Sequence, residues 1–145
     1  MEVCTIGFTQ RSAASFFGTL KQAGIRQLID VRRNNVSQLA GFSKRDDLAF
    51  FLREICGAGY RHEPLLAPTQ ELLDGYRKQQ SGWPAYERGF LALLAERRVE
   101  DHLPRDLFAT PSVLLCSEPA AEHCHRRLVA EYLRERWDGF EIRHL

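Results

Sequence analysis

The chain alternates short apolar runs with longer amphipathic segments, and few folds accommodate this alternation. Residues 3–8 form the first run, which is rich in β-branched side chains and is typical of a buried strand. The other runs that predict strands lie at residues 27–31, 60–63, 113–116 and 140–144. Because strands and helices follow each other in turn, the pattern indicates an α/β fold.

The amphipathic segments between these runs predict the helices. Ser12 is suited to cap a helix over residues 13–23, and Gly24 is suited to end it in a left-handed turn. Ser43 is expected to cap a second helix, whose first turn carries acidic residues suited to the positive end of its dipole. Further helices are predicted after Thr69, from about Pro84, and over residues 123–136.

The strands are apolar on both faces, which favours a mostly parallel sheet covered by helices on each side. The predicted fold is therefore a single three-layer α/β domain, Rossmann-like, with a sheet of about five strands. A length of 145 residues is ordinary for one domain, so residues 1–145 are assigned to it. We expect the last strand at an edge, where it could run antiparallel, and the pattern leaves the strand order open.

Composition and charge exclude several classes of protein. Lys and Arg number 20 against 19 Asp and Glu, and this balance excludes a bulk attraction to nucleic acid or anionic lipid. No run of 18 apolar residues predicts a membrane span, and residues 1–8 read as a strand rather than a signal peptide. We therefore expect a cytoplasmic protein with four reduced cysteines, in which Cys116 and Cys124 are free and Cys4 is not bridged to Cys56.

Polar residues stand where the predicted strands end. In an open α/β sheet, ligands bind beyond the carboxyl ends of the strands, so these residues are the candidates for a site. A helix that starts near Cys124 offers unpaired amide donors, and nearby arginines are suited to hold an anion. The candidates for catalysis are Asp30, Cys116, Glu118 and His125, and those for ligand binding are Thr9, Arg32, Arg33, Cys124 and Arg126.

Each candidate also has a structural interpretation. Asp30 could pair with Arg32, Cys116 could be a small buried apolar residue, and Glu118 could cap a helix or pair with an arginine. We expect Glu118 or Asp30 to hold Arg126 when no ligand is bound, because a buried arginine without a partner is very costly.

Known cofactor and metal motifs do not account for these residues. The five potential ligands between residues 116 and 125 lack paired Cys-x-x-Cys or His-x-x-x-His spacing, so no metal ligands are assigned. A glycine-rich phosphate loop and a Gly-x-Ser-x-Gly elbow are both absent, and the cofactor stays unknown. The aromatic residues Trp83, Tyr86 and Phe90 are interpreted as helix-packing residues.

Five short motifs occur in order along the chain, and the most specific is a Cys-x-Glu followed by Cys-His-Arg. The motifs are Thr5-Ile6-Gly7, Ile29-Asp30-Val31-Arg32, Gly41-Phe42-Ser43-Lys44, Leu115-Cys116-Ser117-Glu118 and Cys124-His125-Arg126-Arg127-Leu128. With them, the chain resembles domain-of-unknown-function family 488, a bacterial and archaeal family, over almost its whole length. The resemblance implies an α/β fold and a shared site, and it implies no particular reaction.

Three classes of function remain open, and the sequence does not decide whether the chain is an enzyme. The first is an enzyme acting on an anionic small molecule, such as a nucleotide, a modified base or another phosphate-bearing compound, with carboxylates and His125 in acid–base roles. The second is a non-catalytic module that binds nucleic acid or a partner protein through a basic face. That face would comprise Arg32, Arg33, Lys44, Arg45, Arg97 and Arg98.

The third class is a rhodanese-like sulfurtransferase. Residues 28–32 are similar to a stretch of rhodanese domains, and Cys116 ends a later strand as their nucleophile does. However, Glu122 occupies the arginine position of the expected Cys-x5-Arg loop, and an acidic residue opposes the formation of a thiolate.

Overall fold

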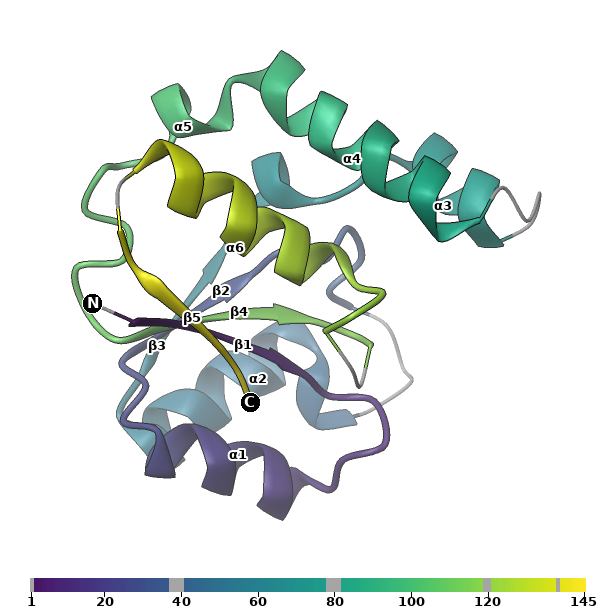
Figure 1. Cartoon of the computed structure of the whole chain (residues 1–145). Helices are drawn as coiled ribbons and strands as arrows, with labels where there is room; N and C mark the ends of the chain where they lie inside the picture. Colours follow the sequence, from purple (N-terminus) through teal and green to yellow (C-terminus); the bar gives the residue numbers. More distant parts are fainter. Residues whose placement is uncertain (1, 37–40, 78–81, 119–120, 138) are drawn as a thin grey trace.

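A five-stranded, all-parallel sheet forms the centre of the computed structural model, which describes residues 2–36, 41–77, 82–118, 121–137 and 139–145 (Figure 1). The strand order is β3-β2-β4-β1-β5. The strands are β1 (Glu2–Gly7), β2 (Gln27–Asp30), β3 (Gly59–His62), β4 (Ser112–Cys116) and β5 (Glu141–His144). The predicted α/β class, with a sheet of about five strands and helices on both faces, is confirmed.

Helices cover the sheet in two layers (Figure 1). One layer contains α1 (Ala13–Gln22) and α2 (Arg45–Phe51), which continues into a π-helical turn, Leu52–Cys56. The other layer contains α3 (Gln70–Arg77), α4 (Trp83–Arg97), α5 (Val99–His102) and α6 (His125–Arg136). Across the ranges that the structure describes, no helix is both long and apolar enough to cross a membrane.

Local signals placed α1 correctly and α2 less well. The Ser12 hydroxyl accepts a hydrogen bond from the Ser15 amide at 3.1 Å, and Gly24 adopts a φ of 71° just beyond the helix. The expected cap at Ser43 is wrong, because the chain makes a separate 3-10 turn, Gly41–Ser43, before the helix begins. Lys44 takes the N-cap position and makes no side-chain capping bond.

The last strand lies at an edge, as expected, but it runs parallel to β1 rather than antiparallel. Val3 is paired with Ile142 in this register. The connection from β4 to β5 passes through α6, and a helical crossover returns the chain to the starting end of the sheet, which produces a parallel strand.

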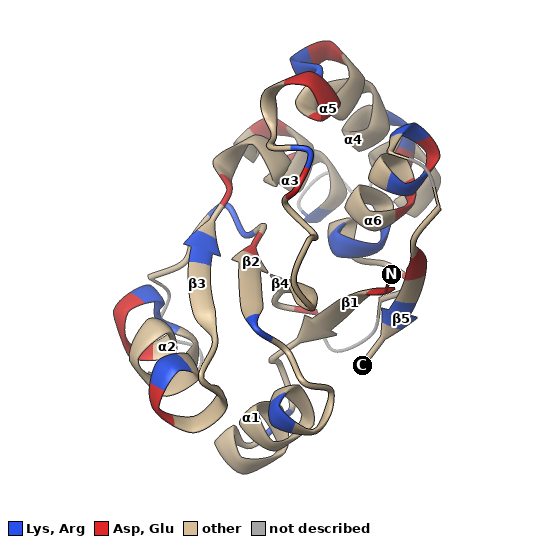
Figure 2. Cartoon of the chain, turned by 90° about the vertical axis from the view of Figure 1, so that its left-hand side faces the viewer, with Lys and Arg blue, Asp and Glu red and all other residues tan. Residues whose placement is uncertain are grey.

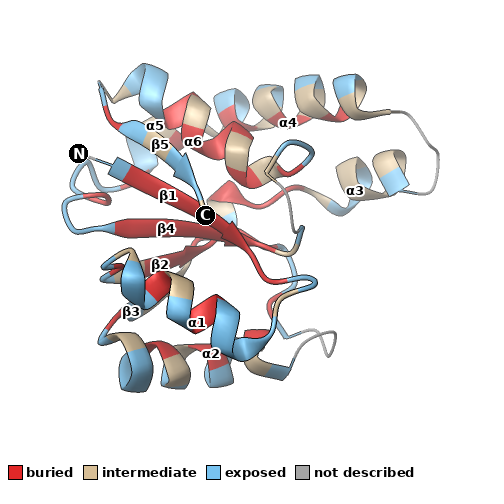
Figure 3. Cartoon of the chain, turned by 60° about the horizontal axis from the view of Figure 1, so that its bottom comes forward, coloured by how far each residue is buried: buried red, intermediate tan, exposed pale blue. Residues whose placement is uncertain are grey.

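The central strands are buried from both sides (Figure 3). Val3 and Leu114 belong to the apolar cluster on the α4 and α6 side, whereas Ile6 and Leu115 belong to the cluster on the α1 and α2 side. Alternate residues of β1 and β4 thus pack into opposite cores, which explains why these central strands are largely apolar.

Parallel register brings the ends of three strands to one edge of the sheet. Gly7, the last residue of β1, is paired with Cys116, the last residue of β4. Asp30, the last residue of β2, is paired with Leu115. Strands β1, β4 and β2 are also neighbours in the sheet, with β4 in the middle.

We expect Leu115→Ala to lower the free energy of unfolding by about 2–5 kcal/mol, because the side chain is fully buried and its removal leaves a cavity. Urea denaturation of the wild type and the variant measures this loss. Phe50→Ala is the control, since Phe50 is 49% exposed and its truncation should change stability much less. Equal losses in the two variants would contradict the assignment of Leu115 to the core.

Candidate functional site

A cavity of about 650 Å³ lies at the carboxyl ends of the strands. Six of the nine candidate residues line it: Arg32, Arg33, Cys116, Glu118, Cys124 and His125. Asp30 and Arg126 are buried and contact lining residues from within the protein, whereas Thr9 is exposed and does not line the cavity. The cavity therefore lies where ligands bind in an open α/β sheet, beyond the carboxyl ends of the strands. This general position does not indicate which residues face the cavity.

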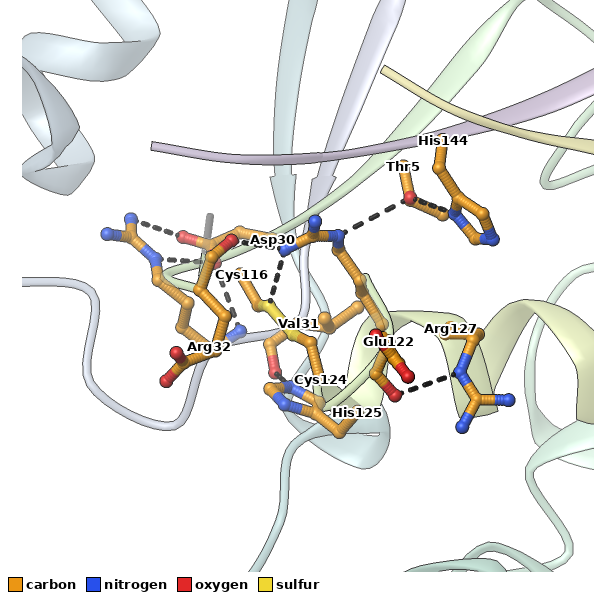
Figure 4. Close-up of a disulfide and its surroundings, with 12 residues drawn as sticks. Thr5, Asp30, Val31, Arg32, Cys116, Glu122, Cys124, His125, Arg127 and His144 are labelled. Carbon is orange, nitrogen blue, oxygen red and sulfur yellow. Dashed lines mark hydrogen bonds and ion pairs between the residues drawn. A yellow bond between two sulfur atoms is a disulfide. The ribbon is translucent and has the colours of Figure 1, made fainter. Parts of the chain in front are cut away.

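Asp30 and Arg32 form a buried ion pair (Figure 4). The Arg32 Nε and Nη2 atoms donate to the two Asp30 oxygens at 2.8 Å each, and Nη2 also donates to the Ser43 carbonyl. The Tyr60 hydroxyl donates to Asp30 Oδ2 at 2.6 Å. Burial, and then the bond to Asp30, raise the pKa of Tyr60 and keep its hydroxyl protonated. This network matches the structural interpretation of the pair.

Cys116 and Cys124 are joined by a disulfide, which corrects the expectation of free thiols at these positions (Figure 4). Cys116 ends β4, and Cys124 is the N-cap residue of α6, so the turn between the two elements brings Cys124 back over the end of the strand. Free thiols are expected where no secretory signal is present, but the distance between two cysteines depends on this return of the chain. Cys4 and Cys56 are both free, as expected.

Arg126 is a buried cation held by neutral acceptors. It is 1% exposed, and its Nη1 donates to the Glu118 carbonyl oxygen at 2.5 Å and to Cys116 Sγ at 3.3 Å. Its Nε donates to Thr5 Oγ1 at 3.4 Å. Glu118 holds Arg126 as expected, but through its main chain, and no described carboxylate forms an ion pair with this guanidinium. Burial lowers the pKa of Arg126 to about 10, and the Glu118 charge partly opposes this change.

His125 is held in one orientation and in its neutral form. Its Nε2 lies 2.7 Å from the Val31 carbonyl oxygen, which can only accept, so Nε2 carries the proton and Nδ1 is left as an acceptor (Figure 4). Burial lowers the pKa of His125 to about 4. The ring is therefore uncharged near neutral pH.

The fold brings three soft donors together although their spacing in the sequence matches no metal motif. The ligand atoms of Cys116, Cys124 and His125 lie within 4.8 Å of one another. Two thiolates and a neutral imidazole suit zinc or copper, and the bond from His125 to a backbone carbonyl is typical of a metal-binding histidine. In the disulfide form, the sulfurs are not thiolates, so this donor set requires the reduced protein.

An aromatic wall on one side of the cavity was not predicted as part of the site. Trp83 stacks on His123 with ring centroids 5.0 Å apart and on Tyr86 with centroids 5.2 Å apart. Tyr76 packs against both Trp83 and Tyr86. Tyr86 and Phe90 do belong to the core, as interpreted, whereas Trp83 is only half-buried. Local periodicity cannot reveal this wall, because it depends on how α3 and α4 pack over the strand ends.

Two exposed arginines also line the cavity, and one of them, Arg77, was missed. Arg33 Nε donates to Gln70 at 3.2 Å. Within the described part of the chain, neither Arg33 nor Arg77 forms an ion pair with a carboxylate. Their charges therefore remain available to a ligand, in contrast to that of Arg32.

Several residues of the hypothetical basic face bind other protein groups. Arg97 donates to the carbonyls of Leu65 and Ala67. Arg98 pairs with Asp101, and Arg45 pairs with Asp46. Figure 2 shows Lys and Arg interspersed with Asp and Glu over the outer helices. Of the six residues of this face, Arg33 lines the cavity and has no carboxylate partner among the described residues, whereas Arg32, Arg45, Arg97 and Arg98 are engaged within the protein.

Residues 12–133 match the family model described as Domain of unknown function DUF488. The chain belongs to this family. The resemblance to the family is thereby confirmed; four of the five motifs lie within the match, and Thr5-Ile6-Gly7 precedes it. Searches of the curated proteins and of the solved structures gave no match. The DUF488 assignment carries no specific activity, so the function has to be argued from the site.

In this DUF488 chain, we expect Gly7→Ala to lower the free energy of unfolding by about 1–3 kcal/mol, the usual cost of overpacking. A Cβ at Gly7 would overlap the Glu118 carbonyl oxygen and lie 2.7 Å from Arg126 Nη1. Gly18→Ala is the matched control, because nothing lies within 4 Å of its added Cβ and alanine favours the α1 helix. Urea denaturation should show a loss only for Gly7→Ala. An unchanged midpoint for that variant would contradict the close approach.

We expect acid to destabilise the protein through His125. The folded pKa of about 4 lies below the unfolded value of 6.5, so the unfolded state binds more protons between these pH values. The free energy of unfolding should therefore fall from pH 6.5 to pH 4, by up to about 1.4 kcal/mol per pH unit from this one group.

Urea denaturation at several pH values measures this slope. His125→Gln should flatten it, whereas His102→Gln, at an exposed position in α5, should keep it. A slope that is the same in all three proteins would rule out His125 as the source.

Proposed function

We propose that the cavity binds an anionic small molecule with a planar ring, such as a nucleotide or a phosphate-bearing modified base, and that the protein is an enzyme acting on it. One observation carries this proposal. The guanidinium groups of Arg33 and Arg77 line the same cavity as the aromatic side chains of Trp83 and Tyr86.

The charges around the cavity favour an anion. The Asp30 carboxylate lies 2.8 Å from Arg32 Nη2 and neutralises its charge. Arg32 therefore forms a fixed part of the cavity surface and does not supply a free positive charge. Arg33 and Arg77 have no carboxylate partner among the described residues, and Glu118 is the one described carboxylate side chain in the lining. Guanidinium groups offer paired N–H donors that fit phosphate and carboxylate oxygens.

The aromatic wall supports the planar part of the ligand. Trp83 is half-buried and lies against His123 and Tyr86 in nearly parallel stacks, with interplanar angles of 27° and 28°. A rigid aromatic surface of this kind can stack on a base or another flat ring. The volume of about 650 Å³ lies in the range of ordinary small-molecule sites.

The lining also contains groups for acid–base chemistry. Glu118 is exposed and lines the cavity, so its carboxylate can reach a bound ligand as a general base. His125 is neutral, and its Nδ1 can accept a hydrogen bond that orients the ligand. Asp30 is fully engaged with Arg32 and Tyr60, so its contribution is to position Arg32.

Isothermal titration calorimetry with a panel of mononucleotides, nucleosides and inorganic phosphate tests the proposal. We expect a phosphate-bearing nucleotide to bind, and Arg33→Ala or Arg77→Ala to weaken it roughly tenfold or more, since a hydrogen bond to a charged group contributes about 1.5–3 kcal/mol. Trp83→Ala should weaken nucleotides and leave inorganic phosphate unaffected.

Arg88→Ala is the matched control, because Arg88 is exposed on α4 and does not line the cavity. It should bind as the wild type does. Equal weakening by Arg88→Ala, or the absence of binding by any member of the panel, would contradict the proposal. Binding of nucleic acid alone, with a steep salt dependence, would instead favour a non-catalytic module.

A further inference from the structure

The Cys116–Cys124 disulfide lies between a buried guanidinium and the start of a helix, and both cysteines line the cavity. We propose that this pair is a redox-active disulfide that oxidises small thiols entering the cavity, and that Arg126 stabilises the Cys116 thiolate that is released. This inference concerns the sulfur chemistry of the site, and it stands whether or not the cavity binds nucleotides.

Arg126 favours the reduced state of the pair. In the disulfide form its described hydrogen-bond acceptors are the Cys116 sulfur, the Thr5 hydroxyl and the Glu118 carbonyl, none of which carries a negative charge. A buried cation without an anionic partner is unfavourable. Reduction converts the Cys116 sulfur, 3.3 Å from Nη1, into a group that can ionise and supply that partner. A disulfide whose reduced form is stabilised in this way is an oxidant rather than a structural bridge.

The α6 helix favours a thiolate on the other sulfur. Cys124 is the N-cap residue of this twelve-residue helix, and its side chain makes no capping bond. The first turn has no acidic residue and carries two arginines, Arg126 and Arg127, of which Arg127 pairs with Glu131. The unpaired amides and the positive end of the helix dipole lower the pKa of a cysteine at such a position.

Two acidic residues between the cysteines, Glu118 and Glu122, oppose the formation of a thiolate, and both are exposed. The Glu118 carboxylate acts on Arg126 through space, but it does not form an ion pair with the guanidinium, and water screens it. A thiolate in direct contact with Nη1 therefore interacts with Arg126 more strongly than the Glu118 side chain does.

The exchange proceeds in two steps. A thiolate RS⁻ attacks Cys124 Sγ, the Cys116–Cys124 bond breaks, and its electron pair stays on Cys116 Sγ beside Arg126. A second thiolate then attacks the sulfur of R in the mixed disulfide, and Cys124 leaves as a thiolate. Two thiols thus lose two protons and two electrons to form RS–SR, and the protein gains the two electrons. Attack on Cys124 is favoured because Cys116 is then the leaving group, and Arg126 Nη1, 3.3 Å from its sulfur, stabilises the thiolate that leaves.

The other two cysteines serve as internal references. Cys4 Sγ donates to a Glu2 oxygen, and burial together with the Glu2 charge raises the pKa of Cys4 to about 11. Cys56 donates to the Phe17 carbonyl, and burial raises its pKa as well. Neither has an arginine donor within hydrogen-bonding distance in the described structure, so both should react slowly.

The first experiment equilibrates the full chain in glutathione buffers of graded ratio with a chelator present, and then counts thiols by alkylation under denaturing conditions and mass spectrometry. We expect a reversible change between two and four free thiols, with peptide mapping to Cys116 and Cys124. A pair that stays oxidised in excess dithiothreitol, or one that never forms in oxidised glutathione, would overturn the proposal. Reduced protein that retains one equivalent of zinc and resists oxidation would overturn it in favour of a metal site.

The second experiment measures the pH dependence of iodoacetamide alkylation in Cys124→Ser, in which Cys116 is a single thiol. We expect Cys116 to react with an apparent pKa below the ordinary value of about 8.5. Cys4 and Cys56 should react only at higher pH.

Adding Arg126→Met should raise the apparent pKa of Cys116 by at least one unit, which slows its alkylation at pH 7 because less thiolate is present. Arg126→Lys keeps the charge and should give an intermediate value, and circular dichroism confirms that each variant is folded. Where Arg126→Met does not fold, Arg126→Lys alone decides the outcome. The same pH profile of Cys116 alkylation in the proteins with arginine, lysine and methionine at position 126 would overturn the role of Arg126. Where Arg126→Met does not fold, the same profile with arginine and with lysine would overturn it.

Discussion

The Arg126 guanidinium lies where four segments of the chain meet. It bonds to Thr5 in β1, to Cys116 at the end of β4 and to the Glu118 carbonyl beyond that strand, and it belongs to α6 itself. Thr5 in turn shares a 2.6 Å hydrogen bond with His144, which connects the edge strand β5 to the same network. The approach is so close that Gly7 has no room for a Cβ. The shape of the strand-end edge therefore depends on one buried cation.

The two buried arginines of the site meet the cost of burial in different ways. Arg32 has a carboxylate partner in Asp30, and its Nε and Nη2 atoms donate to groups within the protein. Removal of Arg32 would leave Asp30 as an unpaired buried charge, so this arginine is needed for stability. Arg126 has neutral acceptors and keeps an uncompensated charge. The first arrangement is complete without a ligand, whereas the second gains stability from any negative charge that develops beside it.

The sequence predicted the elements well because they depend on local patterns. Strand positions follow from apolar runs, and Ser12 and Gly24 mark the ends of α1 through short-range hydrogen bonds and backbone conformation. Six candidate residues line the cavity because the carboxyl ends of parallel strands lie at the same end of the sheet. The direction of β5, the disulfide and the aromatic wall of Trp83 were not predicted, since each depends on how segments distant in the sequence return over the sheet.

The proposed anion site and the proposed disulfide chemistry share one electrostatic environment. Reduction of Cys116–Cys124 would place negative charge on the floor of the cavity that Arg33 and Arg77 make attractive to anions. A bound anion and a thiolate would then compete for the same positive potential. By linkage, an anionic ligand that binds the oxidised form more tightly must also favour the disulfide by the same factor. The charge on the sulfur pair and the occupancy of the cavity are therefore coupled, because both depend on a positive potential to which Arg33, Arg77 and the buried Arg126 contribute.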